Sequence, residues 1–361
     1  MKLRRFLTSL IAPFLGVVVS IAVTAAILVF IHASVSGVFS AMLKYGTSPR
    51  AESLILNLAT TYFLSALAVA IGFKMNLFNI GVNGQYVLGA VAAGAVAGNL
   101  SLPKPISLTI TIAVAMLVGA AWAGVAAWLK VARGVSEVIS TIMLNFIAIA
   151  IISFLIIRTS IGTETAMNIR GTQIIPESGM LRGSAFIDPK TKVYGFFFVT
   201  IFIGILYWFV LNRTRFGYDL RATGHSASAA RVSGIEAKRM TTITMLLSGA
   251  LAGLVGLPYL LGDAASYNLN FPTDWGFTGI AIALLGRNNP LGIAFGALLW
   301  AFLDVSSGQL ILEGVPREIT TIMQGLIVFV VVMSYEIVRR NQIKSEQNRV
   351  AKALEAQAVS A

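Results

Sequence analysis

The stretch VISTIMLNFIAIAIISFLII, residues 138–157, decides the fold class. It contains no charged side chain, and its length of 20 residues gives a helix about 30 Å long, the thickness of the hydrocarbon core of a bilayer. Within lipid the backbone must bond to itself, so an apolar run of this length forms a helix. The stretch predicts a membrane-spanning helix and therefore an all-α membrane protein.

Similar apolar runs occur on both sides of it along the chain. Two shorter runs, Trp275–Leu285 and Leu291–Leu303, either cross the membrane or dip into it and return, and the sequence does not decide between these. Together with 138–157 and these two shorter runs, the remaining runs predict an all-α polytopic protein of about 8–10 transmembrane helices. The remaining runs are Leu10–Ile31, Leu54–Phe73, Ile80–Gly98, Ile106–Leu129, Gly195–Leu211, Thr241–Leu261 and Ile319–Val338.

The composition agrees with this class. The 361 residues are 57% hydrophobic and 12% charged, about half the charged share of a soluble domain, and the mean hydropathy is +0.82. A soluble enzyme is excluded. The chain has no cysteine and two histidines, which excludes disulfides, thiolate metal sites and a His-rich metal centre. We expect no catalytic residue, no bound cofactor and no metal site in this chain.

The excess of basic residues, 27 Lys and Arg against 15 acidic residues, sets the orientation. Lys and Arg are retained in cytoplasmic segments, and most of them fall inside when both termini are cytoplasmic. We therefore predict an N-in/C-in protein of the cell (plasma or inner) membrane. The transmembrane domain covers 1–338, with an extracellular loop at 158–194, a cytoplasmic loop at 212–240 and a cytoplasmic tail at 339–361.

The first apolar run follows Lys2, Arg4 and Arg5, as in a signal peptide. Its length exceeds that of a signal-peptide core, so we expect a retained helix.

Motifs for energy conversion are missing. No Gly-Lys dipeptide occurs, which excludes the phosphate-binding loop of ATPases. Gradient-driven carriers usually keep an ionisable residue deep in the membrane, whereas Glu137, Asp263 and Asp304 fall at the ends of runs. This disfavours a secondary carrier. Energy for active transport would then come from an ion gradient or from another subunit.

The cytoplasmic segment NRTRFGYDLRATGHSASAARVSGIEAKR, residues 212–239, contains six basic and two acidic residues. Ser226–Val232 favours a short helix, with Gly234 as its C-terminal stop. Positive charge alone would be ordinary for a cytoplasmic loop. A helix of small residues between two glycines, however, could be held by a cytoplasmic partner.

Part of this segment resembles the ABC-transporter permeases that import branched-chain amino acids, ribose and nucleosides. The family pattern fG-x-x-lRA-x-G, AA-x-x-x-GI, SG-x-lAG-x-xG occurs within 216–256. The stretch FNIGVNGQ, residues 78–85, resembles the FNIG-x-[EN]-GQ signature of the nucleoside branch, and EVISTIMLN, residues 137–145, resembles E-x-I-x-TIMLN. The sequence departs from the pattern at two positions. Asn83 stands where the family often has Glu, and Ser226 stands where it commonly has Asn.

The resemblance implies a permease subunit that forms the translocation pathway of an ABC importer. Its partners would be a cytoplasmic ABC ATPase, a second permease subunit (identical or related) and an extracellular substrate-binding lipoprotein, within membrane lipid and without nucleic acid. It also implies that a coupling helix within 221–234 contacts the ATPase. The residues assigned to this loop are Arg221, Gly224, Ala229, Ala230 and Gly234.

Polar side chains inside apolar runs are candidates for the pathway, because an unsatisfied polar group in hydrocarbon is costly. Neutral amides suit an uncharged solute with many donors and acceptors, and nucleosides are the leading expectation. Simple sugars, branched-chain amino acids and an ion-gradient carrier remain alternatives, and interhelical hydrogen bonding is the competing role for each side chain. The candidates are Asn57, Asn79, Asn83, Gln85, Thr141 and Asn145.

Overall fold

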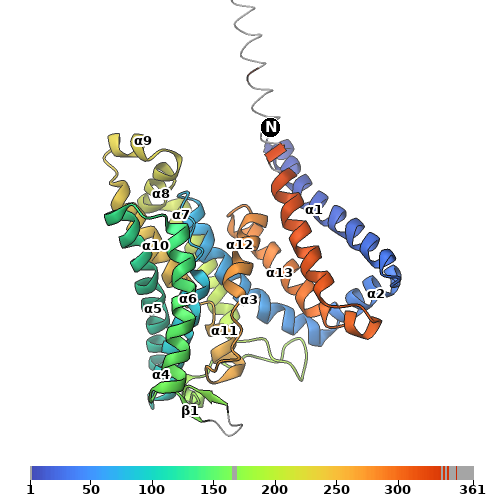
Figure 1. Ribbon diagram of the computed structural model, residues 1–361, viewed down its shortest axis with the longest axis horizontal. Helices are drawn as coiled ribbons and strands as arrows, with labels where there is room; N and C mark the ends of the chain where they lie inside the picture. The colour runs from blue at the N-terminus through green and yellow to red at the C-terminus, as the bar shows by residue number, and fades with distance from the viewer. Residues whose placement is uncertain (1, 165–168, 335, 338–339, 341–346, 348–361) are drawn as a thin grey trace, which may run out of the picture. The chain divides into compact units, whose positions relative to one another are not determined.

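The computed structural model describes residues 2–164, 169–334, 336–337, 340 and 347, and for 2–15 it describes only the helix. The described chain is almost entirely helical (Figure 1). Two short strands, β1 (Thr163–Glu164) and β2 (Arg170–Gly171), pair antiparallel. The predicted all-α class is confirmed. Apart from residues 340 and 347, the predicted tail 339–361 lies outside the described residues.

The chain divides into two compact units, of which Lys44–Val305 is the larger. The predicted extracellular loop of this unit carries a short 3₁₀ turn, η1 (Glu177–Gly179). The long helix Ala237–Ala264 ends in a π turn, η2 (Leu260–Ala264). The α-helices are α3 (Pro49–Phe73), α4 (Val82–Gly98), α5 (Lys104–Arg133), α6 (Glu137–Arg158), α7 (Phe196–Arg213), α8 (Arg215–His225), α9 (Ala227–Val232), α10 (Ala237–Gly253), α11 (Leu257–Tyr259), α12 (Trp275–Leu285) and α13 (Pro290–Ser307), whose last residues pass into the other unit.

The smaller unit joins residues 1–43 to residues 306–361. It holds α1 (Lys2–Phe30), most of α2 (Val35–Gly46), the turn η3 (Leu310–Glu313) and an apolar helix at Glu318–Ser334. The Ser20 hydroxyl donates to the Met323 carbonyl oxygen at 2.8 Å, so α1 packs directly on the last of these helices.

Within the described ranges, six helices are long and apolar enough to cross a membrane: α3, α5, α6, α7, α13 and the helix Ala237–Ala264 that α10 begins. Gly16–Phe30, Trp275–Leu285 and Glu318–Ser334 are shorter apolar helices. Together they confirm a polytopic membrane protein.

Helix α4 forms the centre of the larger unit, packed by α3, α5, α6, α10 and α12. Its sequence VNGQYVLGAVAAGAVAG is rich in glycine and alanine, which lets the surrounding helices approach closely. Between α5 and α10 the approach reaches backbone contact, because a Cβ atom at Gly119 would overlap the Gly249 carbonyl oxygen. The glycine pair Gly249/Gly253 therefore serves packing within the subunit.

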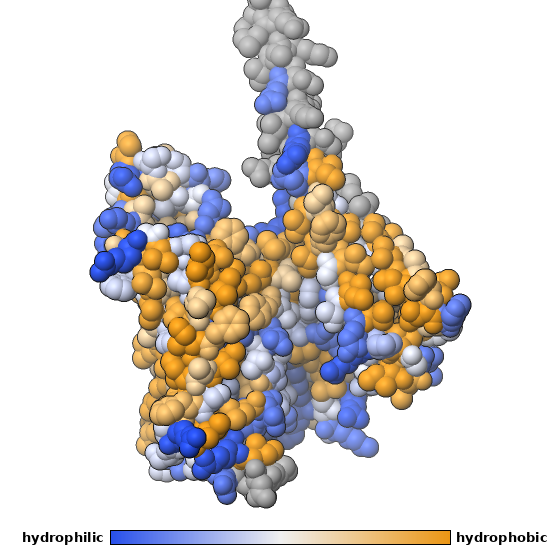
Figure 2. All heavy atoms as spheres, viewed as in Figure 1, coloured by the Kyte–Doolittle hydropathy of each residue, from blue (hydrophilic) through white to orange (hydrophobic). Residues whose placement is uncertain are grey.

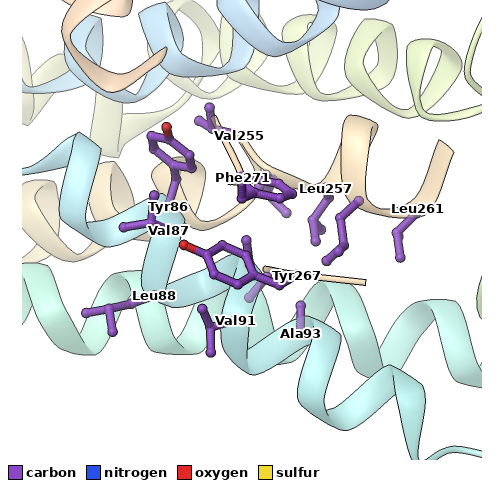
Figure 3. Packing of buried hydrophobic residues seen from close by; sticks show 14 of the residues in the cluster. Tyr86, Val87, Leu88, Val91, Ala93, Val255, Leu257, Leu261, Tyr267 and Phe271 are labelled. Atoms are coloured by element: carbon purple, nitrogen blue, oxygen red, sulfur yellow. The ribbon is translucent and has the colours of Figure 1, made fainter. Parts of the chain in front are cut away.

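The apolar core runs along α4 from Tyr86 to Ala97. Tyr86 and Trp275 stack with ring centroids 6.0 Å apart, and Tyr267 stacks on Phe271 at 4.8 Å. Tyr86, Tyr267 and Phe271 belong to one buried cluster with Leu257 and neighbouring aliphatic side chains (Figure 3), and Trp275 packs against it. Trp275 is thus part of the aromatic core.

The surface of the larger unit carries an apolar band between polar ends (Figure 2). Exposed large side chains on α6 and α7, among them Phe146, Phe154, Phe198 and Phe202, form part of this band. Helix α9 and the strand β1 lie at opposite ends of the unit (Figure 1). The predicted cytoplasmic loop 212–240 and the predicted extracellular loop 158–194 therefore lie at opposite ends of this unit (Figure 1).

The predicted extracellular loop is folded onto the unit. The Thr172 amide donates to the Tyr267 carbonyl oxygen at 2.8 Å, and the Thr172 hydroxyl accepts from the Tyr267 amide at 2.9 Å. A Cβ atom at Gly98 would lie 2.7 Å from the Gln173 carbonyl oxygen, so this loop rests on the end of α4. Beyond these contacts, Phe186 is exposed.

Candidate functional site: polar groups around the start of helix α4

The segment between α3 and α4 is held by a buried pair of amides. Asn79 Nδ2 donates to Gln85 Oε1 at 2.9 Å, and Gln85 Nε2 donates to Asn79 Oδ1 at 3.0 Å. Asn79 Nδ2 also donates to the Ser248 hydroxyl of α10 at 2.8 Å, and Asn79 Oδ1 accepts from the Gly81 amide at 3.0 Å. The Ser248 hydroxyl donates to the Ala68 carbonyl oxygen of α3 at 2.5 Å. These bonds tie the segment to α3, α4 and α10.

Asn145 of α6 joins the same segment from the other side. Its Nδ2 donates to the Ile80 carbonyl oxygen at 2.9 Å, and its Oδ1 accepts from the Gly84 amide at 2.7 Å. These two backbone groups flank the first turn of α4, where amide groups have no partner within the helix. Asn145 therefore caps the start of α4 through a neighbouring helix.

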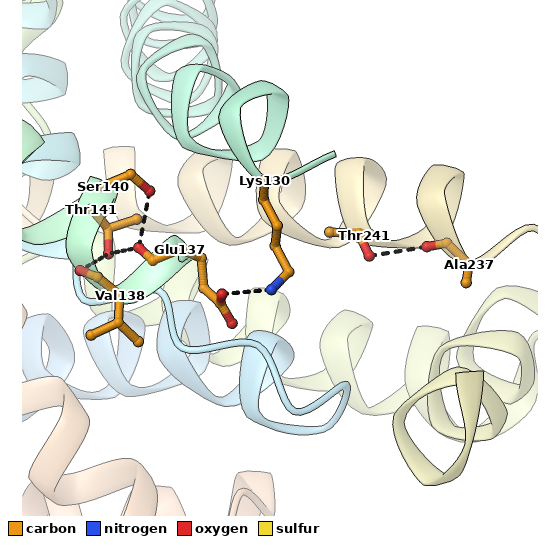
Figure 4. Close-up of polar contacts among 7 residues, drawn as sticks. All are labelled: Lys130, Glu137, Val138, Ser140, Thr141, Ala237 and Thr241. Carbon is orange, nitrogen blue, oxygen red and sulfur yellow. Dashed lines mark hydrogen bonds and ion pairs between the residues drawn. The ribbon is translucent and has the colours of Figure 1, made fainter. Parts of the chain in front are cut away.

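Thr141, one turn before Asn145, is fully buried and bonds to its own helix. Its hydroxyl donates to the Glu137 carbonyl oxygen at 2.6 Å (Figure 4). The Glu137 carboxylate pairs with Lys130 Nζ of α5 at 2.5 Å, and the Glu137 side chain is 10% exposed. This ion pair joins the end of α5 to the start of α6.

Asn57 of α3 lies far from this network and anchors the end of the outer loop. Its Nδ2 donates to the Lys192 carbonyl oxygen at 2.9 Å, and its Oδ1 accepts from the Tyr194 amide at 2.7 Å. Asn57 therefore sets where the outer loop enters α7.

Asn83 differs from the other five candidates. It lies in the first turn of α4 and is 2% exposed, yet its Oδ1 has no hydrogen-bond partner. A Cβ atom at Gly276 would lie 2.5 Å from Asn83 Cα, so the start of α12 packs onto this turn. A buried, unpartnered carboxamide oxygen is costly, and such groups commonly have a role beyond folding. Among the six predicted pathway residues, Asn83 retains unused hydrogen-bonding capacity.

Both Asn-rich turns of the larger unit contain residues in the left-handed conformation, one in the first turn and two, Arg287 and Asn288, in the second. Asn76, between α3 and α4, has φ 55°, and Asn288, between α12 and α13, has φ 54°. Asparagine tolerates this left-handed conformation better than most residues. Each turn is closed by a bond spanning five residues, from Leu77 N to Gly72 O at 3.0 Å and from Asn288 N to Ala283 O at 2.9 Å.

The predicted short helix at Ser226–Val232 is confirmed as α9. The Ser226 hydroxyl accepts from the Ala229 amide at 3.2 Å as its N-cap, and Gly234 ends the turn at φ 80°. Ala230 is buried, whereas Ala229 is exposed and Val232 is 91% exposed. The segment 221–234 is thus divided between two helices at Ser226, and Arg221 and Gly224 belong to α8.

Two contacts were not expected from the sequence. Asn76 Nδ2 donates to the Gly224 carbonyl oxygen at 2.7 Å, and the Tyr62 hydroxyl donates to the Asp304 carboxylate. Asp304, expected at a span end, is therefore bonded to a buried residue of α3. An asparagine three residues after the end of α3 was the available signal for Asn76, while the pairing of Tyr62 with Asp304 has no local signal.

Within 2–164 and 169–334 and the few described residues beyond, no group of three His, Cys, Asp or Glu side chains could hold a metal ion.

The family model described as "Branched-chain amino acid transport system / permease component" matches residues 53–332. The chain belongs to this permease family. It is a multi-pass membrane protein of the plasma membrane. The matched residues include the α3–α4 segment, α8, α9 and the Asn145 cap.

Three relatives that cover three quarters of the chain or more carry transporter names. The guanosine ABC transporter permease protein NupP of Bacillus subtilis is 33% identical over 92% of this chain and 95% of its own. The glucose ABC transporter permease protein TsgB13 of Haloferax volcanii is 30% identical over 89% and 87%. The nucleoside ABC transporter permease protein NupB of Lactococcus lactis is 31% identical over 76% and 77%. No solved structure matches the chain.

Proposed function

We propose that this chain is the permease subunit of an ATP-driven importer and forms the pathway for an uncharged polar solute, with nucleosides as the substrate class. The observation that carries the proposal is the buried, unpartnered Oδ1 of Asn83 at the start of α4. Helix interruptions with free polar groups are where transporters place their substrate sites. An amide can exchange hydrogen bonds with hydroxyl and base-edge groups without requiring a charge.

The substrate class also draws on the relatives named for guanosine and nucleosides. The relative named for glucose makes simple sugars the second candidate. Both classes present several hydroxyl groups to an amide. Branched-chain amino acids are zwitterionic, and the polar cluster around Asn79 and Asn83 contains no ionised side chain to meet them.

ATP would be bound by a partner subunit, and the chain itself would catalyse no reaction. Helix α9 would contact a cytoplasmic ABC ATPase, because it exposes small residues and Val232 at the tip of a basic loop. A second permease subunit would complete the membrane unit. An extracellular substrate-binding lipoprotein would dock on the outer loop, where Phe186 and Lys190 are exposed.

Reconstituted transport tests the proposal. The permease, its ATPase and its binding protein in vesicles should accumulate labelled guanosine or uridine only with ATP, and unlabelled nucleosides should compete better than glucose. Accumulation by the permease alone on an ion gradient would contradict it. Preferential competition by glucose would replace nucleosides with sugars.

The ATPase contact has a separate test. Ala229→Arg places a charged side chain on the exposed face of α9, and Gly234→Trp puts a bulky residue at φ 80°, where glycine is favoured. Both variants should uncouple ATP hydrolysis from uptake while the membrane helices stay folded. Unchanged uptake in both would remove α9 from the ATPase interface.

A further inference from the structure

Helix α8 ends directly on the turn that joins α3 to α4. Asn76 Nδ2 donates to the Gly224 carbonyl oxygen at 2.7 Å. A Cβ atom at Gly224 would overlap the Lys74 carbonyl oxygen and lie 2.9 Å from Met75 Cα. Only glycine allows this backbone approach, so α8 and the turn touch without an intervening side chain.

Helices α8 and α9 share a stiff junction. Ser226 N donates to the Ala222 carbonyl oxygen at 3.1 Å, closing the last turn of α8, and the Ser226 hydroxyl caps the Ala229 amide of α9. One serine therefore ends α8 and begins α9. Displacement of α9 by a partner on its exposed face would therefore be transmitted to Gly224, which lies about one helical turn away.

The other side of the turn leads to the pathway candidate. Asn79, three residues after Asn76, is held by Gln85 and Ser248, and the Ile80 carbonyl is held by Asn145. These bonds fix the segment to α4, α10 and α6. Displacement of the turn at Asn76 is thereby passed to the first turn of α4, where Asn83 lies.

The Met75 side chain gives the turn a second attachment. The Thr244 hydroxyl of α10 lies 3.2 Å from Met75 Sδ, and Met75 is 6% exposed. The turn is therefore packed between α8 and α10, which makes it a rigid connector.

We propose that Asn76 is a positioning residue, whose bond to Gly224 makes α8 and the α3–α4 turn move together, so that displacement of α9 shifts Asn83 at the start of α4. The inference rests on the proposed contact of α9 with an ATPase. Asn76 would thereby contribute to transport without contacting either the substrate or the ATPase.

The first test replaces Asn76 with glycine, which accepts φ 55° and removes only the side chain. In the complete transporter, Asn76→Gly should lower uptake at least tenfold. The amount of ATPase that copurifies with the permease, and the basal rate of ATP hydrolysis, should stay at the wild-type level. Asn288→Gly is the matched control, because Asn288 has φ 54° in a turn away from α8. Normal uptake by Asn76→Gly, or an equal loss in both variants, would overturn the proposal.

The second test joins α8 to the α3–α4 turn by a covalent cross-link. Introduced cysteines can be cross-linked selectively because the chain has no cysteine of its own. A double variant, Asn76→Cys with His225→Cys at the exposed residue next to Gly224, is joined by a short thiol cross-linker in the assembled transporter. Joined protein should recover uptake that the unjoined double variant lacks, since the two elements again move together. Full cross-linking without recovery would show that the two elements must separate, contrary to the proposal.

Failure of this inference is distinct from failure of the proposed function. If Ala229→Arg abolishes coupling while Asn76→Gly transports normally, α9 contacts the ATPase but its motion follows another route. If Ala229→Arg and Gly234→Trp both transport normally, the ATPase contact itself is misplaced.

Discussion

Asn79 and Gln85 exchange two hydrogen bonds, each amide donating to the carbonyl oxygen of the other, at 2.9 and 3.0 Å. Both side chains are essentially fully buried. The pair links the loop before α4 to the first turn of that helix, which begins at Val82. Polar residues of the FNIGVNGQ stretch thus divide into those that build the loop and Asn83, whose Oδ1 the loop leaves unpartnered.

Removing one amide of the pair should destabilise the membrane domain. Gln85→Ala leaves one N–H of the buried Asn79 carboxamide unpaired, while its bonds with Ser248 and Gly81 remain, and such an unpaired group costs about 1–3 kcal/mol. Thermal unfolding of the purified protein in detergent should occur at a lower temperature than for the wild type. An unchanged unfolding temperature would mean that the amide pair does not hold this loop.

Replacement of Asn83 should affect transport more than stability. Asn83→Ala removes an oxygen that has no hydrogen bond, so its unfolding temperature should fall less than that of Gln85→Ala. The KM for nucleoside uptake should rise about tenfold, the equivalent of about 1.4 kcal/mol. Wild-type uptake kinetics in Asn83→Ala would remove this residue from the pathway.

Two lysines near the predicted cytoplasmic face should respond differently to loss of charge. Burial, and the neighbouring Arg221 guanidinium, hold the pKa of Lys74 below its usual value. The folded state therefore binds this proton less tightly than the unfolded chain does, and its stability rises with pH between the lowered pKa and the usual 10.5. Lys74→Gln removes this unfavourable charge and should raise hydrogen-exchange protection in α8.

Lys130→Gln serves as the comparison. It leaves the Glu137 carboxylate, 10% exposed, without the ammonium group 2.5 Å away, and should lower stability by about 1–3 kcal/mol. Thermal unfolding of both variants checks the pair of expectations. If Lys74→Gln lowered stability as much as Lys130→Gln, the like-charge environment assigned to Lys74 would be wrong.

The contact between α5 and α10 should not tolerate a side chain. Gly119→Ala places a methyl group against the Gly249 carbonyl oxygen, where the neighbour is backbone and cannot move aside. Expression of folded protein should fall several-fold. Gly124→Ala, on the same helix, meets only the flexible Leu246 side chain at 3.2 Å and should express normally. Equal expression of the two variants would contradict backbone contact at Gly119.

Local sequence rules determined which segments are helices. The runs near Leu54–Phe73, Ile106–Leu129 and Val138–Ile157 appear as α3, α5 and α6, because length and apolarity alone specify a helix in lipid. Helix α9 was also predictable, since Ser226 and Gly234 carry its start and stop signals in themselves. Helices α2 and α8 were not predicted, because neither has a long apolar run.

The roles of the buried amides were decided by the tertiary structure. Asn57, Asn79, Asn83, Gln85 and Asn145 are alike in the sequence: each is an uncharged amide in apolar surroundings. Whether such a group is satisfied depends on partners far along the chain, as with Asn79 and Ser248, 169 residues apart.

The sequence by itself therefore determined a polytopic helical membrane protein and the family pattern, since hydropathy and helix signals act within one segment. Only the folded chain determined that Asn83 is left unpartnered and that Asn76 meets Gly224. Hydrogen bonds between helices depend on their packing, and that packing is set by close glycine contacts such as Gly119 with Gly249, which no local pattern specifies.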